Sequence, residues 1–481
     1  MNTVFQESVP AARAATKETT QSMKCGLWWM STESDLFIRE CNTNTTRIWP
    51  NHNPLSPMPE HKLVPVIADP LQDLMVTISL LRSIHVPNTV QAYHVFWLDI
   101  RMLSSQAPHP DSACTSLDCS HYFDACGIHH VVFMNEPAIC GDRIVVPYCT
   151  YTDNNTWRQQ MFIQVVDWRK GQVECHPVGH DVQSRSHQHN FHLIDRQTFV
   201  VIDLENSISL YTFQGFGGPP QRRIVYCFPI CSSVRRPSCV VHTTPLLQGT
   251  AVRPDLMPSY VPTLESQIMV LEMFLPVLPI ILVIDMAIFS ENALHSEALI
   301  TMPWSDWGPH HTRCFPHDPS HRISVFGSRM AYALPRYRTP TAGHRMEALS
   351  TDGRFYVHIW DFNERVIARS KSTSDSNSLD HLIRKPPWLA HMCYNSNFNS
   401  NHSYATTVCH ASFPTRDFAG LFLEQDRLTL TWVRPDVVDI QVVSPQVVPE
   451  TKVLSCWLRD SIKLIMDFWD RWPLCVMSYF R

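Results

Sequence analysis

The chain has 481 residues, of which 44% are apolar and 17% are charged, so the composition is that of a folded globular protein. Its formal net charge is −5 and its basic residues form no run longer than a pair such as Arg235-Arg236, which excludes an electrostatic nucleic-acid interface. The first residues lack the apolar core of a secretory signal. We therefore predict a cytoplasmic or nuclear protein that is not secreted and keeps its cysteines as free thiols.

The N-terminal segment, residues 1–25, is polar and shows no apolar periodicity. Chain ends of this kind are usually poorly ordered. We therefore predict a mobile N-terminal segment, followed by one folded domain that spans residues 26–448.

Six short segments of this domain follow one template. In each of them, β-branched and aromatic residues alternate with polar ones before a carboxylate or hydroxyl residue, as in a half-buried strand. The fifth contains Trp360-Asp361, the dipeptide that is typical of WD-type propeller repeats. The six segments are Val95–Ile100, Ile163–Trp168, Ile208–Phe213, Ile268–Met273, Val357–Phe362 and Ile440–Ser444.

Several of these segments have a second strand-like run just upstream, after a turn. These runs are Arg143–Pro147, Phe199–Ile202, Met330–Leu334 and Arg427–Trp432. A repeated order of turn, strand, loop and strand predicts antiparallel hairpins around a common centre. We predict an all-β, β-propeller-like fold with six to eight irregular blades; a decorated β-sandwich is the competing fold.

One stretch, Ile268–Phe289, is apolar and long enough to cross a membrane if it were a helix. Glu272 and Asp285 oppose that interpretation, because a carboxylate near the bilayer centre is costly. Two buried strands, Ile268–Phe274 and Ile280–Phe289, joined by a Pro-Val-Leu-Pro turn, fit the sequence better. We predict no membrane span.

Two further segments differ from the blades. Residues 371–403 are rich in serine and asparagine and are predicted to be a polar insertion loop. Residues 449–481 carry leucine, isoleucine and tryptophan at helical spacing and are predicted to form an amphipathic helical tail. The apolar stripe of this tail either packs on the propeller or docks on a partner or a membrane surface.

The sequence has no hydrolase, phosphate-loop or dinucleotide signature, so we predict no catalytic residue and no cofactor. The weak candidates for a metal site are Cys314, His317 and His321, whose spacing resembles a zinc ligand set. Because prolines place them in a loop, a chance cluster is the favoured interpretation. Trp304 and Trp307 suggest either a ligand box or, preferably, packing between blades.

Several stretches resemble the C-terminal region of the large F-box protein family of basidiomycete fungi, over about residues 26–448. They include "AICGDRIVV", "FIQVVDWRKGQ", "SYVPTLESQIMVLE", "YVHIWDFNERVIARS" and "LFLEQDRLTLTWVRP". In that family an N-terminal F-box docks on the adaptor of a cullin-type ubiquitin ligase, and the C-terminal part holds the substrate. The F-box itself is not seen in this sequence.

The resemblance implies a non-enzymatic protein–protein interaction domain, similar to the substrate-recognition part of an F-box protein. Its partner is a protein of unknown identity, and the cullin-ligase adaptor is a further candidate partner. The alternative is a propeller enzyme with an active site at the channel mouth, which would require histidines or carboxylates to converge there, with or without a metal.

Overall fold

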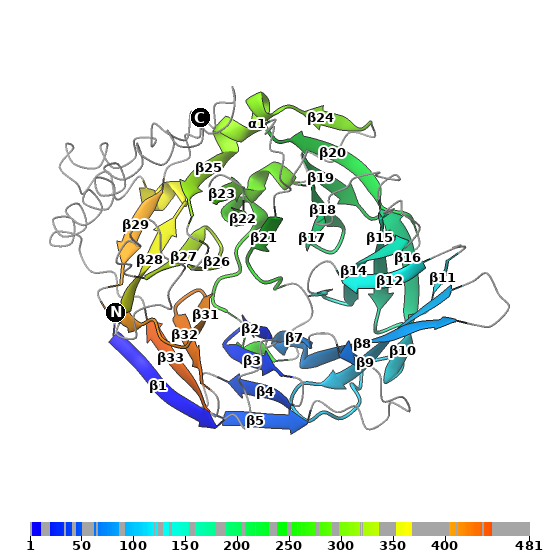
Figure 1. Ribbon diagram of the computed structural model, residues 1–481, viewed down its shortest axis with the longest axis horizontal. Helices are drawn as coiled ribbons and strands as arrows, with labels where there is room; N and C mark the ends of the chain where they lie inside the picture. Colours follow the sequence, from blue (N-terminus) through cyan, green and yellow to red (C-terminus); the bar gives the residue numbers. More distant parts are fainter. Residues whose placement is uncertain are drawn as a thin grey trace, which may run out of the picture.

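The described residues form seven β-sheets arranged in a ring (Figure 1). The computed structural model describes residues 2–10, 20–32, 35–40, 45–50, 62–63, 66–85, 92–119, 121–123, 128–133, 137–152, 159–178, 189–203, 207–216, 218–229, 238–247, 253–256, 258–274, 279–290, 298–317, 319, 321–335, 353–367, 404–409, 411–434 and 437–444. Each sheet is one blade, and the prediction of an all-β propeller with six to eight blades is confirmed.

The first three blades follow one another along the chain. The first contains β2 (Thr20–Lys24), β3 (Leu27–Ser31), β4 (Asp35–Glu40) and β5 (Thr45–Pro50). The second contains β6 (Lys62–Leu63), β7 (Ile67–Asp69), β8 (Leu74–His85), β9 (Ala92–Met102), β10 (Ser116–Asp118) and β11 (His121–Phe123). The third contains β12 (Ile128–Phe133), β13 (Ala138–Cys140), β14 (Arg143–Thr152), β15 (Gln159–Asp167) and β16 (Gln172–Val178).

The fourth and fifth blades are interlocked. The fourth contains β17 (His189–Leu193), β18 (Thr198–Asp203), β19 (Ser207–Thr212) and β20 (Gln221–Cys227), and its edge also receives β24 (Ile300–Met302) in parallel. The fifth contains β21 (Ser238–His242), β22 (Ile268–Phe274), β23 (Ile280–Asp285) and β25 (Thr312–Pro316). β24 lies between β23 and β25 in the chain. The segment that connects two strands of the fifth blade therefore contributes a strand to the fourth.

The last two blades complete the ring. The sixth contains β26 (Arg322–Phe326), β27 (Arg329–Pro335), β28 (Arg354–Asp361), β29 (Ala405–Val408) and β30 (Phe413–Pro414). The seventh contains β31 (Phe418–Leu423), β32 (Leu428–Val433) and β33 (Val437–Ser444), with β1 (Asn2–Pro10) as its outer strand. The helical elements outside the blades are η1 (Pro70–Gln72), η2 (Pro254–Leu256), η3 (Leu264–Ser266), η4 (Met286–Phe289) and α1 (Trp304–His311).

The N-terminal strand closes the ring. β1 pairs antiparallel with β33, from Asn2 opposite Ser444 to Pro10 opposite Val437 (Figure 1). The prediction of a mobile segment over residues 1–25 differs from this arrangement, since β1 and β2 both belong to blades. The backbone ladder supplied by the other end of the chain orders a segment that has little apolar periodicity of its own.

The core consists of seven apolar clusters, and each lies between two neighbouring blades of the described structure. In β22, Ile268 and Val270 face the sixth blade, while Met269 and Leu271 face the fourth. Both faces of the strand are therefore buried, which explains why the sequence is apolar at consecutive positions instead of alternating. This arrangement confirms the two-strand interpretation of Ile268–Phe289, with its last residues in η4.

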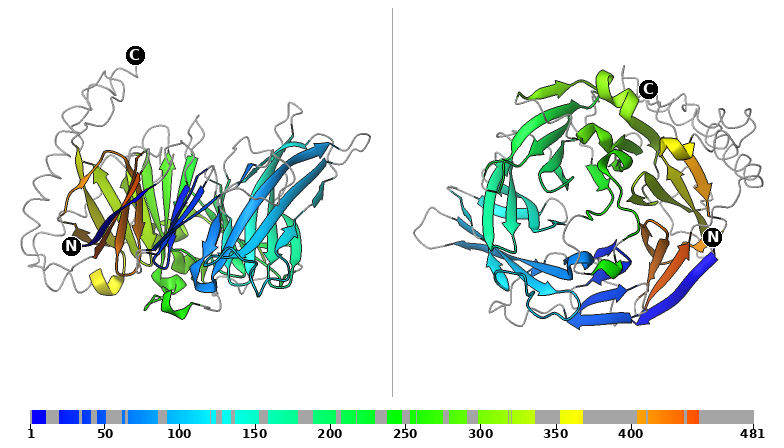
Figure 2. Two further views of the ribbon diagram at one scale, coloured as in Figure 1. Left: turned by 90° about the horizontal axis from the view of Figure 1, so that it is seen from below. Right: turned by 180° about the vertical axis from the view of Figure 1, so that it is seen from behind.

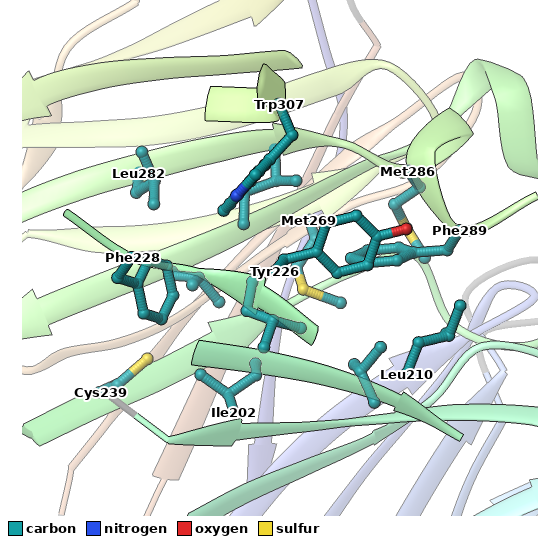
Figure 3. Packing of buried hydrophobic residues seen from close by; sticks show 14 of the residues in the cluster. Ile202, Leu210, Tyr226, Phe228, Cys239, Met269, Leu282, Met286, Phe289 and Trp307 are labelled. Carbon is teal, nitrogen blue, oxygen red and sulfur yellow. The ribbon is translucent and has the colours of Figure 1, made fainter. Parts of the chain in front are cut away.

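The cluster between the fourth and fifth blades is the largest set of buried side chains in the ring (Figure 3). Trp307 is 1% exposed, and its indole Nε1 donates to the carbonyl oxygen of Cys227 at 3.1 Å. The hydroxyl of Tyr226 donates to the carbonyl of Ile288 at 2.6 Å. Trp304 packs edge-on against Trp307. The two tryptophans thus pack between blades, which was the preferred interpretation, and do not form a ligand box.

The template segments occupy equivalent places in their blades. Five of the six lie in the third strand, counted from the centre, in β9, β15, β19, β28 and β33. The exception is Ile268–Met273, which is the second strand of its blade, and the third is β23. The four upstream runs are second strands, β14, β18, β27 and β32. The hairpin interpretation is therefore confirmed.

The aspartate that ends three of these third strands fixes the following turn. The Oδ1 atom of Asp361 accepts from the backbone N–H of Asn363 at 2.9 Å. Asp285 accepts in the same way from Ala287 at 3.0 Å, and Asp167 from Lys170 at 3.0 Å. Short polar side chains that satisfy the backbone of the next residues favour such turns. The Trp-Asp dipeptide therefore marks one instance of a recurring strand end.

Three predictions about segments outside the blades have different outcomes. Within the part of the chain that the structure describes, no helix is long and apolar enough to span a membrane. The predicted insertion loop, residues 371–403, and the predicted amphipathic tail, residues 449–481, lie outside the described residues.

Candidate functional site

One connection between strands runs across the centre of the ring. Residues 243–267, which we call the crossing segment, join β21 to β22, the first two strands of the fifth blade. In Figure 1 this green segment passes over the centre to lie beside β2 and β7, and Figure 2 (left) shows it at one face of the ring. The equivalent connections of the other blades are short turns at the same face of the ring. We call this face the mouth.

Hydrogen bonds attach the crossing segment to the turns of three other blades. The hydroxyl of Thr244 accepts from the N–H of Gly327 at 2.7 Å in the sixth blade. The amide oxygen of Gln425, in the seventh blade, accepts from the N–H of Tyr260 at 3.0 Å. The N–H of Arg253 donates to the carbonyl of Leu71 at 3.0 Å in the second blade. The described parts of the segment, residues 243–247, 253–256 and 258–267, are therefore attached to three other blades.

Gly327 is required where the crossing segment passes closest to a turn. Its φ of +60° lies in the left-handed region, and a Cβ atom there would be 3.3 Å from the Pro262 ring. Glycine therefore supplies both the turn conformation and the space for the crossing segment.

The crossing segment exposes two adjacent apolar side chains. Tyr260 is 47% exposed and Val261 is 38% exposed. The Tyr260 hydroxyl lies 2.9 Å from the hydroxyl of Ser266, and this hydrogen bond holds the phenol side chain in place. A fixed aromatic side chain at a surface loses little entropy on binding, which suits it to anchor a partner.

A cavity of about 180 Å³ lies between the crossing segment and the turns of the first, sixth and seventh blades. Its described lining residues are Lys24, Cys25, Gly26, Pro245, Leu247, Asp255, Leu256, Pro258, Ser259, Phe326, Glu424, Gln425, Asp426 and Arg427. Burial raises the pKa of the Cys25 thiol to about 12. The thiol is therefore neutral at physiological pH and unsuited to nucleophilic catalysis.

Glu424 connects the seventh blade to the first. Its Oε1 atom accepts from the N–H of Gly26 at 2.7 Å, and its Oε2 atom lies 3.6 Å from the guanidinium Nε of Arg427. Burial raises the pKa of the Glu424 carboxyl above its usual value, although the Gly26 hydrogen bond and the charge of Arg427 oppose that shift. The mouth thus contains a carboxylate, that of Glu424, whose ionised form is disfavoured by burial.

The predicted metal candidates do not come together as a set. Cys314 on β25 faces the cluster between the fourth and fifth blades, whereas His317 and His321 lie on the side of the sixth blade. Consecutive residues of β25 face opposite interfaces, with Cys314 toward the fourth blade and Phe315 toward the sixth, and both histidines follow the end of this strand. Among the described residues, no group of three histidine, cysteine, aspartate or glutamate side chains is placed to hold a metal ion.

His317 and His321 instead belong to a polar network between the fifth and sixth blades. The Tyr332 hydroxyl lies 3.2 Å from Nδ1 of His317 and 2.9 Å from Nδ1 of His321. Nε2 of His317 lies 2.7 Å from Oε1 of Glu272, and Nε2 of His242 lies 2.9 Å from Oε2 of the same carboxylate. His242 directly precedes the crossing segment. The network thus secures the start of that segment.

Burial raises the pKa of the Glu272 carboxyl, but the hydrogen bonds and charges of His242 and His317 outweigh it and lower the pKa to about 2. We expect Glu272→Gln to reduce the free energy of unfolding by about 1.5–3 kcal/mol at pH 7, because the neutral amide loses a hydrogen bond to a charged group. A depressed pKa stabilises the fold above the unfolded value of about 4.5, and this contribution disappears as the pH falls toward 2.

Urea unfolding of wild type and variant between pH 7 and pH 3 measures this effect, and the two curves should converge toward the acidic end. Glu265→Gln, at an exposed position of η3, is the matched control and should leave stability unchanged at every pH. A difference between wild type and Glu272→Gln that is independent of pH contradicts the assignment of an ionised Glu272.

Sequence reasoning missed the residues at the mouth. Tyr260 and Val261 lie within one stretch of the family resemblance, "SYVPTLESQIMVLE", and Glu424 lies within another, "LFLEQDRLTLTWVRP". The Gln-Asp pair after Glu424 did predict a turn. No local signal shows that the crossing segment spans the ring, because its contacts are with blades far away in the chain.

The strand order and the seven clusters between blades define a seven-bladed β-propeller. No protein-family model and no curated protein matches the chain. Among solved structures, it is similar to the WD40 domain of SCAP from fission yeast, with 6% identity, 88% of this chain and 81% of that chain covered, and a TM-score of 0.39. It is also similar to the N-terminal domain of Nup159, with 10% identity, 65% and 72% covered, and a TM-score of 0.27.

Proposed function

We propose that this propeller binds a protein partner at its mouth. The observation that carries the proposal is the pair of exposed apolar side chains, Tyr260 and Val261, on a segment that hydrogen bonds hold across the ring. Because the ring and the segment are already ordered, binding there costs little conformational entropy. Aromatic anchors of this kind contribute much of the affinity of protein interfaces.

We further propose that the partner is the substrate of a cullin-type ubiquitin ligase, for which this chain acts as the recognition part in the cytoplasm or nucleus. The family resemblance supports this role, because the resembling stretches include the end of the crossing segment, residues 259–267, and the turn that carries Glu424. A non-enzymatic role agrees with the neutral Cys25 thiol at the mouth cavity.

The test is affinity purification of the tagged full chain from its own cells, followed by mass spectrometry. The double variant Tyr260→Ser, Val261→Ser should recover at least about tenfold less partner, because two anchors that each contribute more than about 1 kcal/mol exceed the 1.4 kcal/mol of a tenfold change. The control is Ile48→Ser on the outer strand β5, where Ile48 is 50% exposed, and it should recover the partner fully.

The identities of the recovered proteins separate the two levels of the proposal. Recovery of a cullin and its adaptor supports the ligase role. Their absence, together with another partner that depends on Tyr260 and Val261, retains the interaction propeller and rejects the ligase role. Equal recovery by wild type and double variant rejects binding at the mouth.

A further inference from the structure

Most of the charged groups around the mouth cavity form ion pairs. The ammonium group of Lys24 lies 3.0 Å from Oδ2 of Asp69, and Nε of Arg427 donates to Oδ1 of Asp426 at 3.0 Å. The guanidinium of Arg253 lies 3.2 Å from Oε1 of Glu40. Lys24 and Arg253 are therefore paired with carboxylates other than Glu424, whereas Arg427 is shared between Asp426 and Glu424.

Among the described residues that line the cavity, Glu424 and Asp426 share a single cation, Arg427. The Glu424 side chain is only 13% exposed, and its Oε2 atom is buried without a hydrogen-bond donor. Arg427 makes an ion pair with Oε2 at 3.6 Å, but its Nε gives its hydrogen bond to Asp426. A buried carboxylate oxygen without a hydrogen-bond donor lowers the free energy of unfolding. A ligand in the cavity that donates to Oε2 would remove this penalty.

We propose that the cavity receives a basic side chain, lysine or arginine, of the partner, and that its cationic group pairs with the carboxylate of Glu424. This inference rests on the proposed binding of a protein at the mouth. The last torsion of a glutamate side chain is soft, so a small rotation turns Oε2 toward the incoming donor. Both carboxylate oxygens move in this rotation, so it has to be small enough for Oε1 to keep the hydrogen bond from Gly26.

The size and the charge of the cavity agree with this occupant. About 180 Å³ exceeds the roughly 150 Å³ of an engineered cavity that holds a benzene ring, so the end of a lysine or arginine side chain fits. The rim adds the carboxylates of Asp255 and Asp426, which are 61% and 69% exposed at their side chains and pair with Arg253 and Arg427. An acidic side chain would meet these carboxylates as well as Glu424, and an apolar one would leave Oε2 without a donor.

The decisive variant is Glu424→Gln. Glutamine keeps an oxygen that accepts from Gly26 but removes the negative charge. Because burial raises the pKa of the Glu424 carboxyl, its ionised form is disfavoured in the folded state, and its stabilising contribution at acidic pH is lost as the pH rises. At pH 7.5 we therefore expect Glu424→Gln to unfold at the same temperature as wild type or at a higher one, while it loses binding.

The experiment presents the purified full chain with a library of acetylated hexapeptides in which each position is fixed in turn as one of the amino acids. Wild type should prefer lysine and arginine over norleucine and glutamate at one position by at least tenfold, and Glu424→Gln should lose that preference. Glu364→Gln, at an exposed position that does not line the cavity, is the matched control and should retain it.

A preference for acidic or apolar residues, a basic preference that survives in Glu424→Gln, or the lack of any basic preference overturns the inference. If the cellular partner still depends on Tyr260 and Val261 in any of these cases, the proposed function stands and only the role of Glu424 falls. If recovery of the cellular partner does not depend on Tyr260 and Val261, the proposed function itself is rejected.

Discussion

A chain that lacks residues 2–10 should lose about 4–8 kcal/mol of its free energy of unfolding. β1 pairs with β33 along eight register positions, and each net backbone hydrogen bond contributes about 0.5–1 kcal/mol. The loss affects the whole ring, because β1 is the strand by which the two ends of the chain meet in one blade. Urea unfolding of the truncated and full chains measures the difference.

A synthetic peptide of residues 2–10 is the control for this truncation. If β1 acts by pairing with β33, the peptide should bind the truncated chain and restore its midpoint of unfolding, since a ligand of the folded state stabilises it by mass action. An unchanged midpoint after truncation contradicts closure of the ring by β1.

Trp307→Ala should cost about 3–5 kcal/mol, the usual range for truncation of a fully buried tryptophan. The indole contacts Tyr226 and Phe228 of the fourth blade from a segment of the fifth (Figure 3). Its Nε1 donates to the carbonyl oxygen of Cys227. The variant therefore loses apolar contacts and leaves a backbone carbonyl without its donor. Urea unfolding with a tryptophan-independent probe, such as far-ultraviolet circular dichroism, measures the loss.

Trp97→Ala is the matched control for the removal of an indole. Trp97 is 37% exposed on β9 of the second blade, so its truncation should cost much less than that of Trp307. Equal losses in the two variants, or a loss below about 1 kcal/mol for Trp307→Ala, contradict the role of Trp307 as the link between two blades.

The blade architecture could be predicted because the strands have a local signature. Val357–Phe362 and its relatives end in a residue that caps the next turn, and this preference depends only on neighbouring residues. The assignment of Ile268–Met273 to the template was less accurate, because β22 and β23 are both buried on two faces and equally apolar. The aspartate that ends β23, Asp285, distinguishes the third strand from the second.

The ring closure could not be predicted, because it depends on pairing between the two ends of the chain. β1 offers no apolar periodicity, and its partner β33 lies more than four hundred positions away. The mouth depends on the same closure. The hydrogen bond between Gly26 and Glu424 joins residues separated by 398 positions, so the environment of Glu424 exists only in the closed ring.

The weak metal candidates, for which a chance cluster was the favoured interpretation, lie in two places in the structure. Cys314, His317 and His321 are close in the chain, but the strand β25 and the entry into the sixth blade direct them to different interfaces. Proximity in the chain does not by itself bring the three side chains together. The histidines serve a network around Glu272 that no spacing pattern in the sequence indicates.

The central claim, that a protein partner binds at the mouth, is tested most directly by hydrogen exchange of the full chain with and without its affinity-purified partner. We expect slower exchange of the backbone amides in residues 258–267 and 424–427, and unchanged exchange in the outer strands β5 and β16. Protection confined to outer strands, with unchanged exchange at the crossing segment, would contradict binding at the mouth.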